Sequence, residues 1–412
     1  MEPFLSASDV MQLLGIKKQT LYAYVSRGIL RRASVPGSRK SMYAREDVEK
    51  MLARKTPTGE LRPTATVDAA QPLINGSFLI PSAITEITPE GPRYRGINAR
   101  DLAAHPGHLE NVAELLWTGV LIDEPVIWTD EPAPTNVEPA IAALQRGEGH
   151  IPILRVMAAA SLALGESAAE ELRSGNTARL ARRIISAYAG CLGLLVDGGQ
   201  FVRRCEGESL ASLALRALGK EQSVRATAAL NTLFICCADH ELSPATYAAR
   251  VVASTGAGLQ ACLIAAIGAH SGHLLGGACD RLDGLFFGDQ GLGNLREALL
   301  LGRNTQRKLP GFGHQLYPQG DPRAGWLFDL TNELAPNDAV SDVRSFAEEV
   351  YTETGLKPSL ELGLVVVARA LGLPHRSASA LWAIGRSVGW VAHIMEQRLS
   401  GTLIRPRARR SG

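Results

Sequence analysis

The stretch GFGHQLYPQGDPR, residues 311–323, combines small residues with an imidazole and a guanidinium. Gly311 and Gly313 let the backbone come close to a ligand, because neither carries a Cβ atom. His314 can donate a hydrogen bond to a carbonyl oxygen, and Arg323 can bind a carboxylate through two parallel hydrogen bonds. Together these groups suit a small oxo-acid.

The same stretch, written as the pattern GFGHxxYxxxDPR, resembles the citrate synthase family. Further matches occur in family order: YRGINARDL at 94–102, ENVAELLWTG at 110–119, ADHEL at 238–242, RVVASTGA at 250–257, AIGRSVGWVAH at 383–393 and IRPR at 404–407. The resemblance covers about residues 75–412 and implies a mainly α citrate synthase fold. It also implies a large helical domain, a small helical domain at about residues 275–370, an active-site cleft between them, and a homodimer.

The resemblance implies roles for five residues in binding a 2-oxo dicarboxylate such as oxaloacetate. His314 would polarise the carbonyl group and His240 would contact the oxo-acid. The carboxylates would be held by Arg323, Arg386 and Arg405, the last reaching the site of the neighbouring subunit. Three arginines suffice for two carboxylates, and burying them together without an anion would be costly.

The residues that would bind acyl-CoA match the family less completely. The loop with Lys308, Gly311 and Gly313 would lie against coenzyme A, so acetyl-CoA or another acyl-CoA is the implied co-substrate. No permanently bound cofactor is implied. The six cysteines show no CxxC and no ligand spacing with histidine, so no metal site is expected.

Two positions depart from the family pattern. In SGHLLGGA, residues 271–278, Leu275 stands where the family has the histidine that stabilises the enol of acetyl-CoA. His273 lies two residues earlier, about 200° round a helix, and could replace that histidine only if the backbone there is not helical. Glu361 stands where the family has its aspartate base. A lost oxyanion donor typically costs about 3 kcal/mol, and a misplaced base can cost about 100-fold in rate. A fast citrate synthase is therefore not expected.

Residues 1–55 predict a winged helix-turn-helix DNA-binding domain, called the head below. Ser8 and Asp9 are expected to cap a first helix that ends near Leu14, with a second helix over 17–25 and a wing tip over 36–40. The pattern LYxYxxRGxL…GSRxxxYxxEDVE resembles the MerR/excisionase type. A basic three-helix module that binds protein, or that binds nothing, is the alternative. The expected base contacts are Lys17, Lys18, Gln19, Thr20 and Tyr22, and the expected phosphate contacts are Arg39 and Lys40.

Charge is distributed unevenly along the chain. Residues 1–62 hold twelve Lys and Arg against six Asp and Glu, so this end carries +6 while the whole chain carries +2. A basic end joined to a mildly acidic remainder points to an anionic partner, here double-stranded DNA, at one end only. Residues 56–74 are rich in Pro, Thr and Ala and predict a linker to the body, residues 75–412.

Composition indicates a cytoplasmic protein. Apolar residues make up 46% and charged residues 20% of the 412 residues. The amino terminus has neither a basic nor an apolar signal region, and the cysteines are interpreted as reduced and mostly buried. Val251–Cys279 lacks Asp, Glu, Lys and Arg, but its Gly, Ala, Ser and His content favours a buried helix over a membrane span.

Three functions stay open at this point. The chain is a slow or altered acyl-CoA condensing enzyme, or a DNA-binding regulator whose body senses a dicarboxylate or acyl-CoA, or an enzyme whose head serves only for oligomerisation or docking.

Overall fold

The computed structural model describes most of the body and part of the head. The described residues are 4–14, 21, 24–25, 30–34, 41–44, 47–48, 80–105, 107–129, 137–145, 152–166, 168, 170–171, 175, 177–288, 292–297, 299 and 309–406. The predicted linker, the predicted wing tip, Lys308 and every predicted DNA-contacting residue lie outside these ranges.

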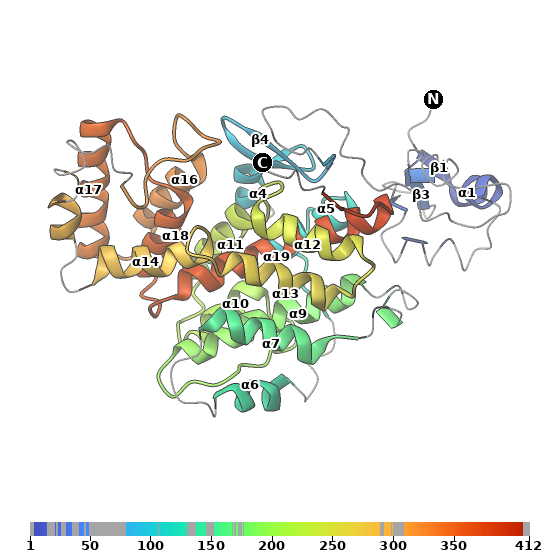
Figure 1. Ribbon diagram of the computed structural model, residues 1–412, viewed down its shortest axis with the longest axis horizontal. Coiled ribbons are helices and arrows are strands. Elements are labelled where there is room, and N and C mark those ends of the chain that lie inside the picture. The colour runs from blue at the N-terminus through green and yellow to red at the C-terminus, as the bar shows by residue number, and fades with distance from the viewer. Residues whose placement is uncertain are drawn as a thin grey trace, which may run out of the picture.

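The body is mainly helical (Figure 1). Its larger group contains α4 (Ala99–Ala104), α5 (Leu109–Thr118), α6 (Val137–Gln145), α7 (Ile153–Leu164), α9 (Thr177–Cys191), η1 (Leu192–Leu195), α10 (Leu210–Ala217), α11 (Val224–Cys237), α12 (Pro244–Ser254), α13 (Leu259–His270) and α19 (Ser377–Ser400). Helix α5 covers most of the motif ENVAELLWTG at 110–119. Side chains of Asn98, Ser209 and Ser223 accept hydrogen bonds from backbone N–H groups at the starts of α4, α10 and α11, so polar residues set where these helices begin.

A second group of helices lies at one end of the body (Figure 1). It contains α14 (Gly276–Phe287), α16 (Pro322–Leu330), η2 (Thr331–Glu333), α17 (Asp338–Thr354) and α18 (Leu360–Ala370). These helices pack on one another, and α14, α16 and α18 also contact α19 or α11. The group falls within the predicted small domain, whose boundaries stay a prediction.

Helix α19 forms the centre of the body. It packs against α5, α7, α9, α11, α12, α13, α14 and α18, and almost its whole length is buried. Gly385 and Gly389 allow this close packing: a Cβ at Gly385 would lie 2.6 Å from the Phe234 carbonyl oxygen, and one at Gly389 would lie 2.3 Å from that of Ala238. The functional side chains on α19 are therefore held by a rigid element.

A small antiparallel sheet, which the sequence did not predict, adds to the body. It has the order β4 (Thr85–Thr88), β5 (Gly91–Tyr94) and β6 (Ile97–Asn98). Tyr94 lies wholly buried at the end of β5, and its hydroxyl donates to the Ile235 carbonyl at 2.8 Å. The sheet thus anchors the first part of the body to the end of α11.

The uncharged segment 251–279 is not one buried helix as expected. It contains the end of α12, all of α13 and the start of α14. No helix in the described part of the chain is long and apolar enough to cross a membrane. Helix α13 is apolar on all sides, yet Ala261, Ile264 and Ala265 remain partly exposed.

The described residues of the head form a small sheet, a helix and a separate core. The strand order is β1 (Phe4–Ser6), β3 (Ser41–Ala44) and β2 (Arg32–Ser34), all antiparallel. Helix α1 spans Ala7–Leu14, so Ser8 and Asp9 lie in its first turn and the predicted cap there is wrong. Strands β2 and β3 flank the predicted wing tip, as a wing requires. The core is Leu5, Val10, Leu14, Leu21, Leu30, Tyr43 and Val48.

Candidate functional site

The loop before His314 is pinned to the start of α18. Gly311 and Gly313 have φ values of +84° and +79°, which favour glycine. Gly313 N donates to Lys357 O at 2.9 Å and Ser359 N donates to Gly311 O at 2.8 Å. This pairing brings the stretch that carries His314 beside the helix that carries Glu361.

His314 is oriented as a neutral hydrogen-bond donor. The backbone N–H of Leu316 donates to its Nδ1 atom at 3.1 Å, so in the neutral ring the proton sits on Nε2. Burial lowers the pKa of His314, and Arg323 lowers it further against the opposing charges of Asp321 and Glu361. An Nε2–H group of this kind can donate to the carbonyl oxygen of a ligand.

His240 meets His314 from another part of the chain. It lies in the turn between α11 and α12, is buried, and its ring centroid is 5.5 Å from that of His314. Its Nε2 lies 3.2 Å from the Tyr317 hydroxyl oxygen. Burial, together with the charges of Arg323 and Arg386, holds the pKa of His240 well below its ordinary value. Two neutral imidazoles therefore lie together at neutral pH.

Arg323 is held in place by Asp321. Asp321 caps α16, and its carboxylate accepts from Nη2 of Arg323 at 2.6 Å and from Nε at 3.0 Å. Burial alone would lower the pKa of Arg323, but the Asp321 carboxylate outweighs it and raises that pKa. The Nη1 atom is buried and has no hydrogen-bond partner within the described ranges. A buried N–H donor without a partner is costly, so this atom is suited to an incoming anion.

Arg386 contributes a second buried guanidinium from α19. Its Nε donates to the Cys237 carbonyl at 2.5 Å, and its Nη1 donates to Ser243 Oγ at 3.4 Å. Its guanidinium carbon lies 5.8 Å from the centre of the Trp382 ring.

The Tyr317 ring lies 5.7 Å from the His240 ring, 5.0 Å from the His314 ring and 5.8 Å from the guanidinium carbon of Arg323. Arg386 binds residues 237 and 243, on either side of His240. We call His240, His314, Arg323 and Arg386 the oxo-acid cluster below.

Glu361 lies near this cluster. It is half-buried in the first turn of α18, and its charge acts on the His314 ring and on the Cys237 thiol. A carboxylate is therefore close to the histidine that was expected to polarise the oxo-acid.

Leu275 does not occupy a helical position. It immediately precedes α14 with φ −130° and ψ −125°, and its side chain is partly buried against the main core. The backbone condition for His273 to replace the family histidine is thus met, but His273 is exposed in this turn. Neither residue places a buried donor here.

The structure does not bring every predicted residue into the cluster. Arg405 is exposed beyond the end of α19, whereas Arg323 and Arg386 are buried. Tyr317 and Asp321 were missed as functional residues, although both lie inside the stretch 311–323. The signal was available for Asp321, since an acidic residue before Pro at a helix start is typical of a cap.

Two family models match the chain. The model described as citrate synthase, C-terminal domain, matches residues 74–407, and one described as helix-turn-helix domain matches residues 4–56. The chain therefore belongs to the citrate synthase family, with a helix-turn-helix domain at its amino-terminal end.

Relatives agree with this assignment. Citrate synthase 2 of Bacillus subtilis is 33% identical over 198 residues, which are 47% of this chain and 53% of that protein. The chain thus spans about half the length of this curated relative. The 2-methylcitrate synthase of Shewanella oneidensis is 26% identical over 337 residues, covering 78% of this chain and 89% of that protein.

Solved structures show the same fold. Citrate synthase from the archaeon Thermoplasma acidophilum, in complex with carboxymethyl coenzyme A and oxaloacetate, superposes with a TM-score of 0.69 at 23% identity. The match covers 82% of this chain and 94% of that chain. The citrate synthase of Thermotoga maritima gives 0.68 at 24% identity, over 82% and 94% of the two chains.

Proposed function

We propose that the oxo-acid cluster binds a 2-oxo dicarboxylate resembling oxaloacetate. The observation that carries this proposal is the buried Nη1 of Arg323, which has no partner among the described residues and lies beside a second buried guanidinium and two neutral histidines. The Nε2–H of His314 suits the 2-oxo group, while Arg323 and Arg386 suit the carboxylates. The match to a citrate synthase that was crystallised with oxaloacetate supports this choice.

Condensation with an acyl-CoA is proposed to be slow. In a Claisen-type step, Glu361 would take a proton from the acyl methyl group, and the resulting carbon nucleophile would attack the oxo-acid carbonyl carbon, whose oxygen takes up a proton and becomes a hydroxyl group. Water would then hydrolyse the thioester and release the CoA thiol. Leu275 offers no hydrogen to the thioester oxygen that becomes negative, and such a loss typically costs about 100- to 1000-fold. Coenzyme A contacts are proposed for Lys308, Gly311 and Gly313.

Metabolite sensing by a DNA-binding protein is the second candidate. The match of residues 4–56 to a helix-turn-helix domain and the +6 charge of residues 1–62 favour it. Here double-stranded DNA binds through Lys17, Lys18, Gln19, Thr20, Tyr22, Arg39 and Lys40. The oxo-acid cluster supplies the signal, and catalysis is absent or residual.

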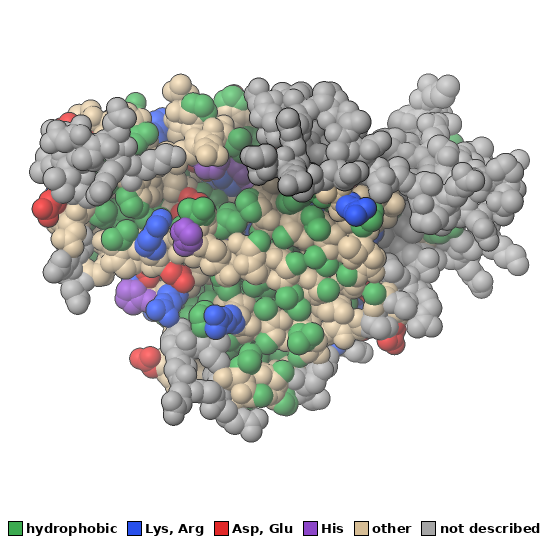
Figure 2. All heavy atoms as spheres, viewed as in Figure 1, with side chains coloured by type: hydrophobic (Ala, Val, Ile, Leu, Met, Phe, Trp, Pro, Cys, Tyr) green, Lys and Arg blue, Asp and Glu red, His purple; other side chains and the backbone are tan. Residues whose placement is uncertain are grey.

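The protein is further proposed to act as a homodimer in the cytoplasm. Figure 2 shows apolar side chains gathered over α12, α13 and α7, and Leu162 on α7 is 69% exposed. A helix that is apolar all round normally has its outer side covered, and a second copy would cover α13. The cysteines of the described chain are free thiols, five of them buried, which suits a reducing compartment.

One experiment tests the function. Purified protein is given oxaloacetate and acetyl-CoA, thiol release is followed, and thermal stabilisation by oxaloacetate alone is measured beside it. We expect stabilisation with little turnover, and much higher turnover in Leu275→His. No stabilisation by oxaloacetate or by other 2-oxo dicarboxylates would refute binding. Fast turnover in the unmodified protein would refute the slow-enzyme proposal.

A salt titration tests the head. If its basic residues contact phosphates, affinity for duplex DNA falls steeply as salt rises, because bound counterions are released. Affinity that does not change with salt would exclude these contacts.

A further inference from the structure

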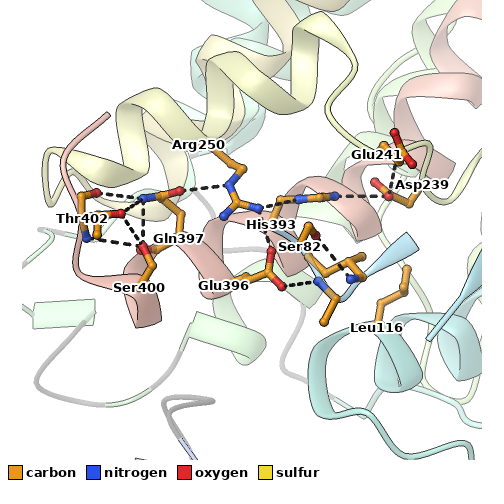
Figure 3. Close-up of polar contacts among 12 residues, drawn as sticks. Ser82, Leu116, Asp239, Glu241, Arg250, His393, Glu396, Gln397, Ser400 and Thr402 are labelled. Atoms are coloured by element: carbon orange, nitrogen blue, oxygen red, sulfur yellow. Dashed lines mark hydrogen bonds and ion pairs between the residues drawn. The ribbon is translucent and has the colours of Figure 1, made fainter. Parts of the chain in front are cut away.

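A chain of buried polar contacts joins residue 239 to residue 402 (Figure 3). Nε2 of His393 lies 3.2 Å from Asp239 Oδ2, and Nδ1 of His393 lies 3.1 Å from Arg250 Nη1. Arg250 Nε then donates to Gln397 Oε1 at 3.0 Å, and Gln397 Nε2 donates to Thr402 O at 2.8 Å. We call Asp239, His393, Arg250 and Gln397 the polar relay. It crosses from the loop before α12, through α19, to the segment after α19.

The contacts fix the direction of every donor in the polar relay. Arginine only donates, so Nδ1 of His393 must accept from Arg250. In a neutral ring the proton then sits on Nε2 and is donated to Asp239. Gln397 accepts on its oxygen and donates from its nitrogen, which sets its amide orientation. The relay therefore has one consistent arrangement, and the two ends of His393 carry separable roles.

One end of the polar relay shapes the loop that holds His240. Asp239 is wholly buried, and its Oδ2 also accepts from the backbone N–H of Glu241 at 3.1 Å. Glu241 has φ +50°, a conformation that a non-glycine residue adopts only when its surroundings enforce it. His240 lies between these two residues, so the Asp239 carboxylate constrains the backbone on both sides of it.

The other end positions the carboxy-terminal segment. Beyond Thr402, the Ile404 N–H donates to Ser254 Oγ on α12 at 3.1 Å. The next residue is Arg405. Glu396 also pairs with Arg250 at 2.7 Å and accepts from the Ala83 N–H at 2.9 Å, which ties the relay to the start of the body.

We propose that His393 is a positioning residue, and that the polar relay couples the placement of His240 to the placement of the segment that carries Arg405. This proposal rests on the proposed function, since it concerns affinity for a 2-oxo dicarboxylate. Apolar side chains of similar volume could join α12 and α19 at no greater cost. If the relay served only for packing, substitutions in it would change the stability of the protein but would not change its ligand affinity in the way described next.

The first test separates the two ends of His393. In His393→Gln the amide can reach Asp239 in place of Nε2, and in His393→Asn it can reach Arg250 in place of Nδ1. Oxaloacetate affinity is measured by calorimetry on full-length protein, and the melting temperature is measured beside it. We expect the glutamine variant to bind within about threefold of wild type and the asparagine variant to lose at least tenfold. Equal losses in both, or no loss in either, would overturn the assignment to His393.

The second test concerns the link to the tail. Gln397→Met keeps the side-chain volume but removes the hydrogen bonds that Gln397 makes with Arg250, Ser400 and Thr402. It is compared with Arg405→Ala and with the double variant. If the polar relay acts through the tail, each single variant weakens binding, and the double variant binds no worse than Arg405→Ala alone. The control is Gln260→Met, because Gln260 lies outside the relay and donates to the Glu166 backbone carbonyl, just beyond the end of α7, at 2.7 Å. The coupling would be overturned if the affinity losses of the two single variants multiplied in the double variant. It would also be overturned if Gln260→Met lost as much affinity as Gln397→Met.

Failure of the two proposals can be told apart. Should wild-type protein show no oxaloacetate binding, the proposed function has failed. Should wild type bind while all relay variants bind equally well, only the relay proposal has failed.

Discussion

In the proposed site, Arg323 would serve both stability and binding. Its pairing with Asp321 uses two of its nitrogens, and its Nη1 has no partner among the residues that the structure describes. The sequence allowed the arginine to be predicted as an anion ligand, because of its motif. It did not show that Asp321 would orient it, since that depends on the three-dimensional start of α16.

Changing this arginine is expected to separate the two roles. Arg323→Met leaves Asp321 buried without its cation and should lower the free energy of unfolding by about 3–5 kcal/mol in urea titrations. Pairing it with Asp321→Asn removes the stranded charge and should restore most of that stability. Neither variant should bind oxaloacetate in calorimetry. Binding by the double variant would show that Arg323 does not contact the ligand.

Two buried histidines predict a dependence of stability on pH. Burial lowers the pKa of His270 to about 3 and holds that of His240 well below 6.5. As pH falls below 6.5, the unfolded chain takes up protons at these positions and the folded protein does not. Stability present at pH 7 should therefore be lost progressively between pH 6.5 and 4, which urea midpoints at each pH would show.

A variant pair checks the source of this dependence. Each such histidine contributes about 1.4 kcal/mol per pH unit. In His270→Gln the amide can still donate toward the Ser379 carbonyl that His270 contacts, so the slope should become shallower. Exposed His105 serves as control, and His105→Gln should leave the slope unchanged. Identical slopes in all three proteins would exclude His270 as a source.

At the scale of elements, the glycines of α19 are expected to be sensitive. A Cβ at Gly385 would lie 2.6 Å from Phe234 O and 2.9 Å from Cys237 Cβ, both on α11. Gly385→Ala should cost about 1–3 kcal/mol in urea unfolding, because two rigid helices must move apart. Gly284→Ala on α14 meets nothing within 4 Å and should be neutral or stabilising. Equal stability of the two variants would contradict the close packing of α19.

Sequence reasoning worked best where long motifs matched. The mainly helical body was predicted from the resemblance to the citrate synthase family. The β4–β5–β6 sheet was missed because its strands are only two to four residues long and lack alternation. Uncharged composition predicts one helix over 251–279, because it does not reveal the turn at Thr255–Gly258. His240 and His314 were found from motifs, whereas the contact between them needed the fold.

At the scale of the whole molecule, the apolar face over α7, α12 and α13 predicts dimerisation. Placing glutamate in it, as Leu162→Glu or Ile264→Glu, should shift sedimentation from dimer to monomer, because a buried unpaired charge is costly. Val224, on α11, is 87% exposed, and Val224→Glu should leave the dimer intact. A monomeric wild type, or a dimer in every variant, would refute this face as the interface.

Leu275 bears on how long a ligand stays bound as well as on how fast it reacts. A site that consumes its ligand holds it only until the next turnover, so its occupancy depends on flux. With no donor at position 275, a bound oxo-acid would leave mainly by dissociation, and occupancy would follow its free concentration at equilibrium. In the proposed sensor, the leucine at position 275 therefore makes the occupancy of the site report the free concentration of the oxo-acid, and this occupancy stays constant while that concentration is steady.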